Sequence, residues 1–263
     1  MKRSNRTAQL SALAFIVPLL VSSTAYAQDS IPAAFRDGRY FSFAGGTSNL
    51  SLYGTTLRGD GEYGDNAGRE AANVRSSGPQ YSVSVGYEFL KSASIIQGVE
   101  ASVSKFDGEH INYGLREDGA IQASVAYDQG PLISVRTKIG VVKGETMFFG
   151  TLGPALLMEK QTRTQYVEVS RGSASSTASF AETDTKIRYG AAMSVGVRKA
   201  IAHDWSMLFE LQYFLLAPTT YHFDDARGGL RTGVGLGYSS VQGRQAESTF
   251  KNTVLLIGLT RKF

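Results

Sequence analysis

Alternation of apolar and polar residues at every second position most strongly constrains the fold of this 263-residue chain. The segment QYSVSVGYEFL (80–90) has an aromatic residue or valine at each odd position from 81 to 89, with serine, glycine or glutamate between them. The segments 186–199 and 205–215 alternate in a similar way. Because strand side chains point to the two faces in turn, each segment has one apolar face and one largely polar or small face. The pattern predicts an all-β fold.

The spacing of these segments predicts eight strands joined by links of two kinds. The strands are expected at 39–53, 79–90, 95–106, 120–142, 147–158, 184–199, 205–216 and 250–263. The short links are 91–94, 143–146 and 201–204, and the long polar links are 54–78, 107–119, 159–183 and 217–249. Loops longer than about 15 residues are uncommon in compact soluble domains. The four long links, which alternate strictly with short ones, are therefore unusual for a compact soluble domain.

Two architectures suit alternating strands: a soluble sandwich or lipocalin-like barrel, and an outer-membrane barrel with its apolar face turned outward. The polar faces are rich in Gly, Ala and Ser, which suit a crowded barrel interior better than a soluble exterior. Aromatic residues lie near the ends of the apolar faces, as interfacial girdles require; they include Tyr81, Phe89, Tyr189, Trp205 and Tyr213. We therefore predict an eight-stranded antiparallel up-and-down transmembrane β-barrel with short periplasmic turns and long extracellular loops.

The N-terminal segment predicts export. A basic stretch at 2–6 precedes the apolar run 10–21, and Ala25 and Ala27 then form an A-x-A cleavage pattern. The apolar run is shorter than the roughly 20 residues of a spanning helix, which argues against an uncleaved anchor. We expect residues 1–27 to be a cleaved signal peptide and residues 28–263 to form the barrel.

Removal of this segment leaves a nearly neutral chain. The full sequence has 27 Lys and Arg against 23 Asp and Glu, and three basic residues fall in the signal, so the remainder is 24 against 23, or +1. No basic patch suggests nucleic acid as a partner. The sequence has no cysteine, so no disulfide stabilises the exported protein.

The segment KNTVLLIGLTRKF (251–263) ends the sequence on Phe263, with Leu255, Ile257 and Leu259 at the same parity. It resembles the C-terminal strand signal of bacterial outer-membrane barrels. That resemblance implies recognition by the barrel-assembly machinery, after transit with periplasmic chaperones. Arg261 departs from the usual aromatic two positions before the terminal Phe, although an Arg near the interface can snorkel to water.

Three blocks together resemble the small opacity-protein/OmpX-like barrel family, especially its alphaproteobacterial porin-family outer-membrane members. They are SVRTKIGVVKGETMFFGTLGPAL (134–156), WSMLFELQYFLL (205–216) and NTVLLIGLTRKF (252–263). The resemblance spans the predicted mature chain and implies the outer membrane of a Gram-negative-type bacterium. Outer-membrane lipid and lipopolysaccharide would be its surroundings.

No catalytic, cofactor or metal site is expected. The sequence has three histidines, His110, His203 and His222, of which the first and last fall in predicted long loops and His203 in a short turn on the opposite side. They do not form a metal-ligand cluster, and no base–nucleophile–orienter set accompanies them. The His and Ser spacing of the lipid A deacylase barrels is also missing. Each histidine is interpreted as solvated surface.

The predicted loops contain two weaker signals. Arg58, Gly59 and Asp60 form the tripeptide that integrins recognise, for which a Gly/Asp turn is the simpler interpretation. Glu62 and Asp65 follow, without the ordered spacing of a Ca²⁺ loop. The segment 170–184 is rich in Ser and Ala and resembles a mobile loop tip. Loops 54–78 and 159–183 are candidates for contact with a host or surface ligand.

Four charged residues have the inward parity of the predicted barrel: Glu100, Arg136, Lys138 and Glu210. Counting residues along each strand from its short turn places the four side chains at similar heights along the barrel axis. An eight-stranded barrel is only wide enough for its own side chains, and an unpaired buried charge is costly. We therefore predict a charge plug in the lumen; the alternative is that one or more of these residues lies low enough for periplasmic water to solvate it.

These features predict an integral outer-membrane protein that contributes to envelope integrity and surface contact and is not an enzyme. A narrow porin-like channel for small solutes is the main alternative. A barrel enzyme that modifies lipid or lipopolysaccharide is a second one.

Overall fold

The computed structural model describes residues 31–57, 69–92, 94–107, 111–117, 120–171, 174–222 and 245–263. These residues form nine β-strands and one 3-10 turn, η1 (Ala33–Phe35). The strands are β1 (Gly38–Leu57), β2 (Arg69–Leu90), β3 (Ile95–Phe106), β4 (Ile111–Glu117), β5 (Ala120–Lys143), β6 (Thr146–Arg171), β7 (Ala174–Ala200), β8 (Trp205–His222) and β9 (Gln245–Lys262). No helix in this part of the chain is long and apolar enough to cross a membrane.

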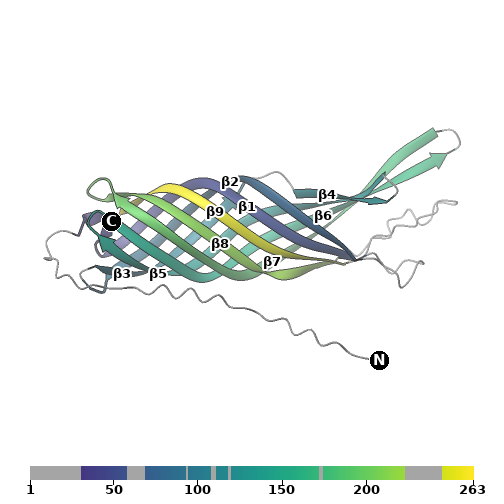
Figure 1. Ribbon diagram of the computed structural model, residues 1–263. Helices are drawn as coiled ribbons and strands as arrows, with labels where there is room; N and C mark the ends of the chain where they lie inside the picture. Colours follow the sequence, from purple (N-terminus) through teal and green to yellow (C-terminus); the bar gives the residue numbers. More distant parts are fainter. Residues whose placement is uncertain are drawn as a thin grey trace, which may run out of the picture.

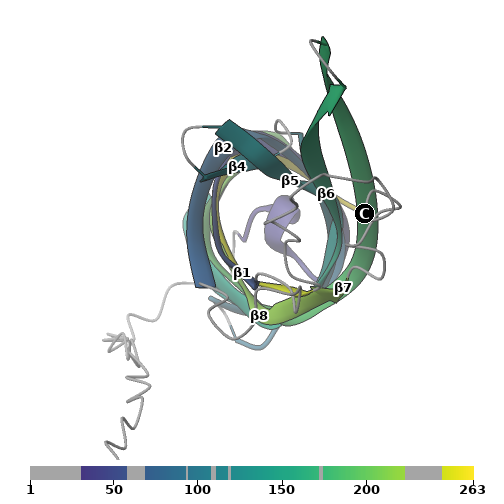
Figure 2. The same cartoon turned by 90° about the vertical axis from the view of Figure 1, so that its right-hand side faces the viewer.

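The strands close into a single antiparallel barrel (Figures 1 and 2). Neighbours along the chain pair with one another except β3 and β4, and β9 pairs with both β8 and β1, which closes the wall. β3 and β4 both pair with β5, at successive places along it, so together they occupy one position in the wall. The wall therefore has eight strand positions. The predicted eight-stranded antiparallel up-and-down barrel is confirmed.

The strands extend further than predicted at the end with the long links, and several expected loops are largely strand. β6 and β7 pair from Thr146–Lys199 to Arg171–Ala174, so the expected loop 159–183 is a hairpin. It projects beyond the rest of the barrel (Figure 1). Strand also replaces predicted loop at 54–57, 69–78, 111–117, 217–222 and 245–249. The reason is that backbone pairing does not depend on side-chain alternation, so it continues beyond the apolar pattern used to place the strands.

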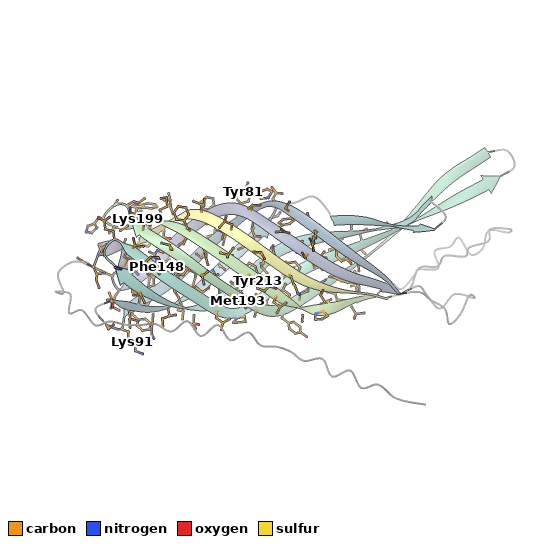
Figure 3. The ribbon with its side chains drawn as sticks, viewed as in Figure 1. Tyr81, Lys91, Phe148, Met193, Lys199 and Tyr213 are labelled. Atoms are coloured by element: carbon orange, nitrogen blue, oxygen red, sulfur yellow. The ribbon has the colours of Figure 1, made fainter. Side chains whose placement is uncertain are left out.

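The distribution of side chains is inverted relative to a soluble barrel. Large apolar residues face outward, as with Leu152 at 57% and Val195 at 62% exposure, whereas Arg136 and Arg188 are buried inside at 1% and 0%. Figure 3 shows Phe148, Met193 and other side chains projecting from the outer wall. An apolar exterior around a polar interior is the arrangement of a transmembrane barrel.

The short links are confirmed as tight connections at one end of the barrel. β5 and β6 are joined by Gly144 and Glu145, and Gly144 adopts a left-handed conformation with φ of 60°. A glycine has no Cβ to oppose this conformation. At the same end, the backbone amide of Phe263 donates to the Arg39 carbonyl oxygen at 2.9 Å, beside the closing pair of β9 and β1.

Candidate functional site

The four charged residues singled out in the sequence lie together in the lumen, toward the end with the short turns. Arg136 of β5 contacts Glu100 of β3 through one guanidinium nitrogen and Glu210 of β8 through the other, the latter at 3.0 Å. The Lys138 ammonium lies 2.8 Å from the second Glu100 oxygen. All four are at least 95% buried. The cluster therefore joins strands on different sides of the barrel.

Glu88 of β2 enlarges this group and was not singled out in the sequence. One of its carboxylate oxygens lies 2.8 Å from Arg198 and 3.3 Å from Lys138, and the other lies 2.9 Å from Lys262. Glu88 is fully buried. Its inward parity was visible in the alternation of segment 80–90. We call Tyr40, Glu88, Glu100, Arg136, Lys138, Arg198, Glu210 and Lys262 the lower cluster.

Tyr40 of β1 fills the space between these charges. Its hydroxyl donates to Glu100 and accepts a hydrogen bond of 2.6 Å from Lys138, whose ammonium also lies 4.3 Å from the centre of the Tyr40 ring. The ring packs against Gly86, where an added Cβ would lie 2.5 Å from the ring carbon that bears the hydroxyl. The absence of a side chain at Gly86 therefore makes room for the phenol.

The 3-10 turn η1 lies inside the barrel at the same end. Figure 2 shows it within the ring of strands. Ala34 and Phe35 are completely buried. Arg198 of the lower cluster donates to the Ala34 carbonyl oxygen at 3.1 Å, and its guanidinium lies 5.4 Å from the centre of the Phe35 ring. The charge network thus holds the turn in the mouth of the barrel.

A second ionic group occupies the lumen toward the projecting hairpin. One Glu159 oxygen accepts hydrogen bonds from Arg188, at 3.1 Å from its Nε, and from the Tyr221 hydroxyl. Gln161 donates to the Tyr127 hydroxyl at 3.1 Å, and the Tyr127 and Tyr221 rings meet edge to face with centres 6.3 Å apart. We call these five buried residues the upper cluster. They come from the neighbouring strands β5, β6, β7 and β8.

Small hydroxyl pairs and apolar side chains also line the lumen. The hydroxyl pairs are Ser42–Thr260 at 2.7 Å, Ser102–Ser134 at 2.7 Å, Ser82–Ser104 at 3.0 Å and Thr151–Ser194 at 2.6 Å. Buried apolar residues include Leu50, Leu52, Leu132, Leu157, Phe214, Leu216, Phe250 and Val254. Close packing and internal pairing of this kind stabilise a filled interior.

The histidines and the loop motifs take no part in these clusters. His203 lies in a short turn, as expected, and its Nδ1 is 2.6 Å from the Asp204 carboxylate at the surface. His222 is the last residue of β8 rather than part of a loop, which corrects its predicted position. Among the described residues, no group of three or more His, Cys, Asp or Glu side chains could hold a metal ion. His110, the tripeptide 58–60, Glu62 and Asp65 lie outside the described residues.

The residues proposed as an assembly signal lie on the outer wall of the closing strand. Leu255, Ile257 and Leu259 are each about half exposed on β9, and Phe263 is 70% exposed just after it. The Arg261 guanidinium lies 5.5 Å from the Trp205 ring and 5.2 Å from the Phe263 ring, so aromatic faces surround it. Recognition of this strand during assembly stays a prediction, as does cleavage after Ala27, which lies with Ala25 outside the described residues.

Comparison with known proteins finds a distant likeness to several solved structures. No family model and no curated protein matches the sequence. The attachment invasion locus protein Ail of Yersinia pestis is 13% identical, with a TM-score of 0.39 over 86% of this chain and 99% of Ail. OprG of Pseudomonas aeruginosa is 11% identical, with a TM-score of 0.47 over 89% and 99%. The protease OmpT of Escherichia coli is 8% identical, with a TM-score of 0.47 over 90% and 100%.

Proposed function

We propose that this chain is an integral outer-membrane β-barrel protein whose lumen is closed and whose role is to maintain envelope integrity. The observation that carries the proposal is the inverted wall, with apolar side chains outward and paired charges inward. Such a surface requires hydrocarbon around it, because exposed apolar residues in a continuous band are unfavourable in water. Outer-membrane lipid and lipopolysaccharide are the surroundings that fit it.

The paired charges inside the barrel support a closed lumen and a structural role over a porin-like channel or a lipid-modifying enzyme. In the lower cluster, carboxylates and cations from strands around the barrel contact one another directly, and η1 fills the mouth beside them. These charged groups bind each other instead of pointing into a substrate cleft. Their mutual pairing offsets the cost of removing them from water.

Location in the outer membrane can be tested on the purified and on the expressed protein. A closed transmembrane barrel should be recovered with the outer-membrane fraction, resist SDS at room temperature and change its migration after boiling. Recovery in the soluble periplasm with heat-insensitive migration would contradict the proposal.

The route to the membrane has two separate tests. We propose export through the cleaved signal 1–27, so N-terminal sequencing of the mature protein should begin near Gln28. We also propose that the barrel-assembly machinery recognises the closing strand, after delivery by periplasmic chaperones. Deleting Phe263 should then lower outer-membrane levels and increase degradation products, whereas normal levels would remove any special role for this residue.

We further propose that the parts beyond the apolar band contact a host or surface ligand. The β6–β7 hairpin supports this, because it is a paired structure that projects beyond the barrel (Figure 1). Replacing residues 163–180 with a short turn should preserve heat-modifiable migration and lower adhesion of expressing cells to host-cell layers. Unchanged adhesion would exclude the hairpin, and the corresponding replacement within 58–68 would test the other candidate region.

A further inference from the structure

The barrel end that carries the short turns is ringed by exposed cations. Six basic residues are exposed there: Arg36, Arg39, Lys91, Lys143, Lys199 and Arg261. Three acidic side chains accompany them, Asp37, Glu145 and Asp204, which leaves an excess of three positive charges among these side chains. Figure 3 shows Lys91 and Lys199 at the end opposite the projecting hairpin. We call these six cations the basic rim.

Two of these lysines lie in one row across three strands. Thr146 at the start of β6 pairs with Lys143 of β5 on one side and with Lys199 of β7 on the other. Two strand spacings separate the lysines, which corresponds to about 10 Å. Both side chains are exposed, and neither has an acidic partner within 4 Å among the described residues. The pair therefore presents two cations outside the barrel that form no direct ion pair with another described residue.

An aromatic residue and a third cation lie on the next two strands, two residues along from this row. Lys199 pairs with Met207, two residues along β8 from Trp205. Trp205 in turn pairs with Arg261 of β9, and the guanidinium lies 5.5 Å from the Trp205 ring. Trp and Arg are both suited to a boundary between hydrocarbon and water, where their apolar parts and polar tips meet different surroundings. We call Lys143, Lys199 and Arg261, with Trp205 between the last two, the basic arc.

The outer wall immediately beyond the basic arc is apolar. Phe148, Val195 and Phe209 of neighbouring strands are 53%, 62% and 41% exposed. Cations directly beside an apolar surface match a phospholipid, in which a phosphate lies directly beside acyl chains. A zwitterionic headgroup carries its own ammonium, which these cations repel. The anionic headgroup of phosphatidylglycerol carries no such group.

We propose that the basic arc binds anionic phospholipid headgroups, such as phosphatidylglycerol, in the periplasmic leaflet and prefers them to zwitterionic ones. This inference rests on the proposed membrane-spanning function. A basic residue close to an anionic lipid surface contributes about fivefold to lipid association. The arc therefore distinguishes one barrel end chemically from the apolar band that any lipid can cover.

Trp205 provides a local probe, because it is the only tryptophan in the sequence. The full-length mature protein is reconstituted in vesicles of phosphatidylglycerol and phosphatidylcholine, with bromine on the chains of one lipid or the other. Brominated lipid quenches tryptophan on contact, so the ratio of the two quenching curves reports which lipid lies beside Trp205. We expect brominated phosphatidylglycerol to show about fivefold or greater relative association.

A matched pair of variants identifies the origin of the preference. The K143Q/K199Q double variant should lower the ratio severalfold, and the part that remains is expected from Arg261 beside Trp205. The K105Q/K160Q control removes two exposed lysines from the outer wall toward the other end and should retain the preference. Loss of preference in both variants would assign it to overall charge and overturn the basic arc.

The two proposals fail in different ways in this experiment. Equal quenching by both brominated lipids in the wild-type protein would overturn the headgroup site and leave the spanning barrel intact. An absence of quenching by either lipid would show that Trp205 does not contact hydrocarbon, and this would contradict the proposed function itself.

Discussion

The lower and upper clusters place buried charge in the same lumen in two different ways. The lower cluster draws its side chains from β1, β2, β3, β5, β7, β8 and β9, almost the whole circumference. The upper cluster comes from four neighbouring strands, with Glu159 and Arg188 at its centre. Contacts across the lumen fix the cross-section of the barrel, whereas contacts between neighbours reinforce a wall that backbone pairing already holds. We therefore expect the lower cluster to control closure and the upper cluster to affect local stability.

Sharing of carboxylates is the second difference. Glu88 contacts three cations, Arg198, Lys138 and Lys262, and Glu100 contacts two. Glu159 has one cationic partner in Arg188, together with the Tyr221 hydroxyl. Loss of a shared carboxylate leaves several buried cations at once, so substitutions in the two clusters should differ in size.

The largest effect is expected for Glu88→Ala. The substitution leaves Arg198 and Lys262 without their carboxylate partner and should lower the free energy of unfolding by about 3–5 kcal/mol. Urea unfolding of the reconstituted barrel, followed by Trp205 fluorescence, measures the change. Glu145→Ala in the exposed β5–β6 turn is the control and should be almost neutral. A loss below about 1 kcal/mol at Glu88 would show that the lower cluster does not hold the barrel together.

A smaller effect is expected when Arg188 is replaced by Met. Glu159 then stays buried with a hydrogen bond from Tyr221, and the expected loss is about 3 kcal/mol. Replacing both partners, in R188M/E159M, should recover most of this loss, because an apolar pair of similar volume can substitute for a buried ion pair. Unfolding of the two single variants and the double variant gives the coupling free energy. Additive losses would mean that the two side chains do not act as a pair.

Gly86→Ala tests the packing of Tyr40 in the lower cluster without changing a charge. The added Cβ would lie 2.5 Å from the phenol and displace it, with an expected loss of about 1–3 kcal/mol. Gly45→Ala is a matched control, because its Cβ would meet the Tyr81 ring at an ordinary 3.6 Å. Equal stability of both variants would indicate that the position of Tyr40 is not constrained by Gly86.

The smallest effect is expected between the clusters, at Ser102→Ala. The variant loses a 2.7 Å hydrogen bond to Ser134 and should lose about 0.5–1.5 kcal/mol. The S102A/S134A double variant should be close to the wild type in stability, since it leaves no unpaired hydroxyl. A loss as large as that of Glu88→Ala would contradict the division of the lumen into ionic clusters and a weakly polar middle.

The barrel could be predicted because membrane strands have a strict side-chain period. Residues 80–90 and 205–215 alternate wherever hydrocarbon covers one face, and their spacing sets the number of strands. The strand extensions at the end of the barrel with the long links could not be predicted in the same way. Residues 159–171 and 174–183 pair as strands, but polar and apolar residues are mixed in their sequences without the regular alternation that was used to place the strands.

The lumen was predictable in part for a related reason. Counting along strands identified Glu100, Arg136, Lys138 and Glu210 as inward residues at similar heights. Glu88 and Arg198 have the same inward parity, but their contact crosses the lumen and depends on strand tilt and stagger, which parity does not define. The burial of Phe35 depends on how η1 enters the mouth, and no periodic pattern marks that segment.

Planar-bilayer recordings test closure of the lumen by the lower cluster most directly. The wild-type protein should insert without steady ion current, whereas E100A/E210A, which removes both carboxylates around Arg136, should show measurable conductance or a marked loss of stability. The exposed double variant K105Q/K160Q serves as the control and should stay silent. Steady, large channels in the wild-type protein would contradict the closed lumen and favour a porin-like channel.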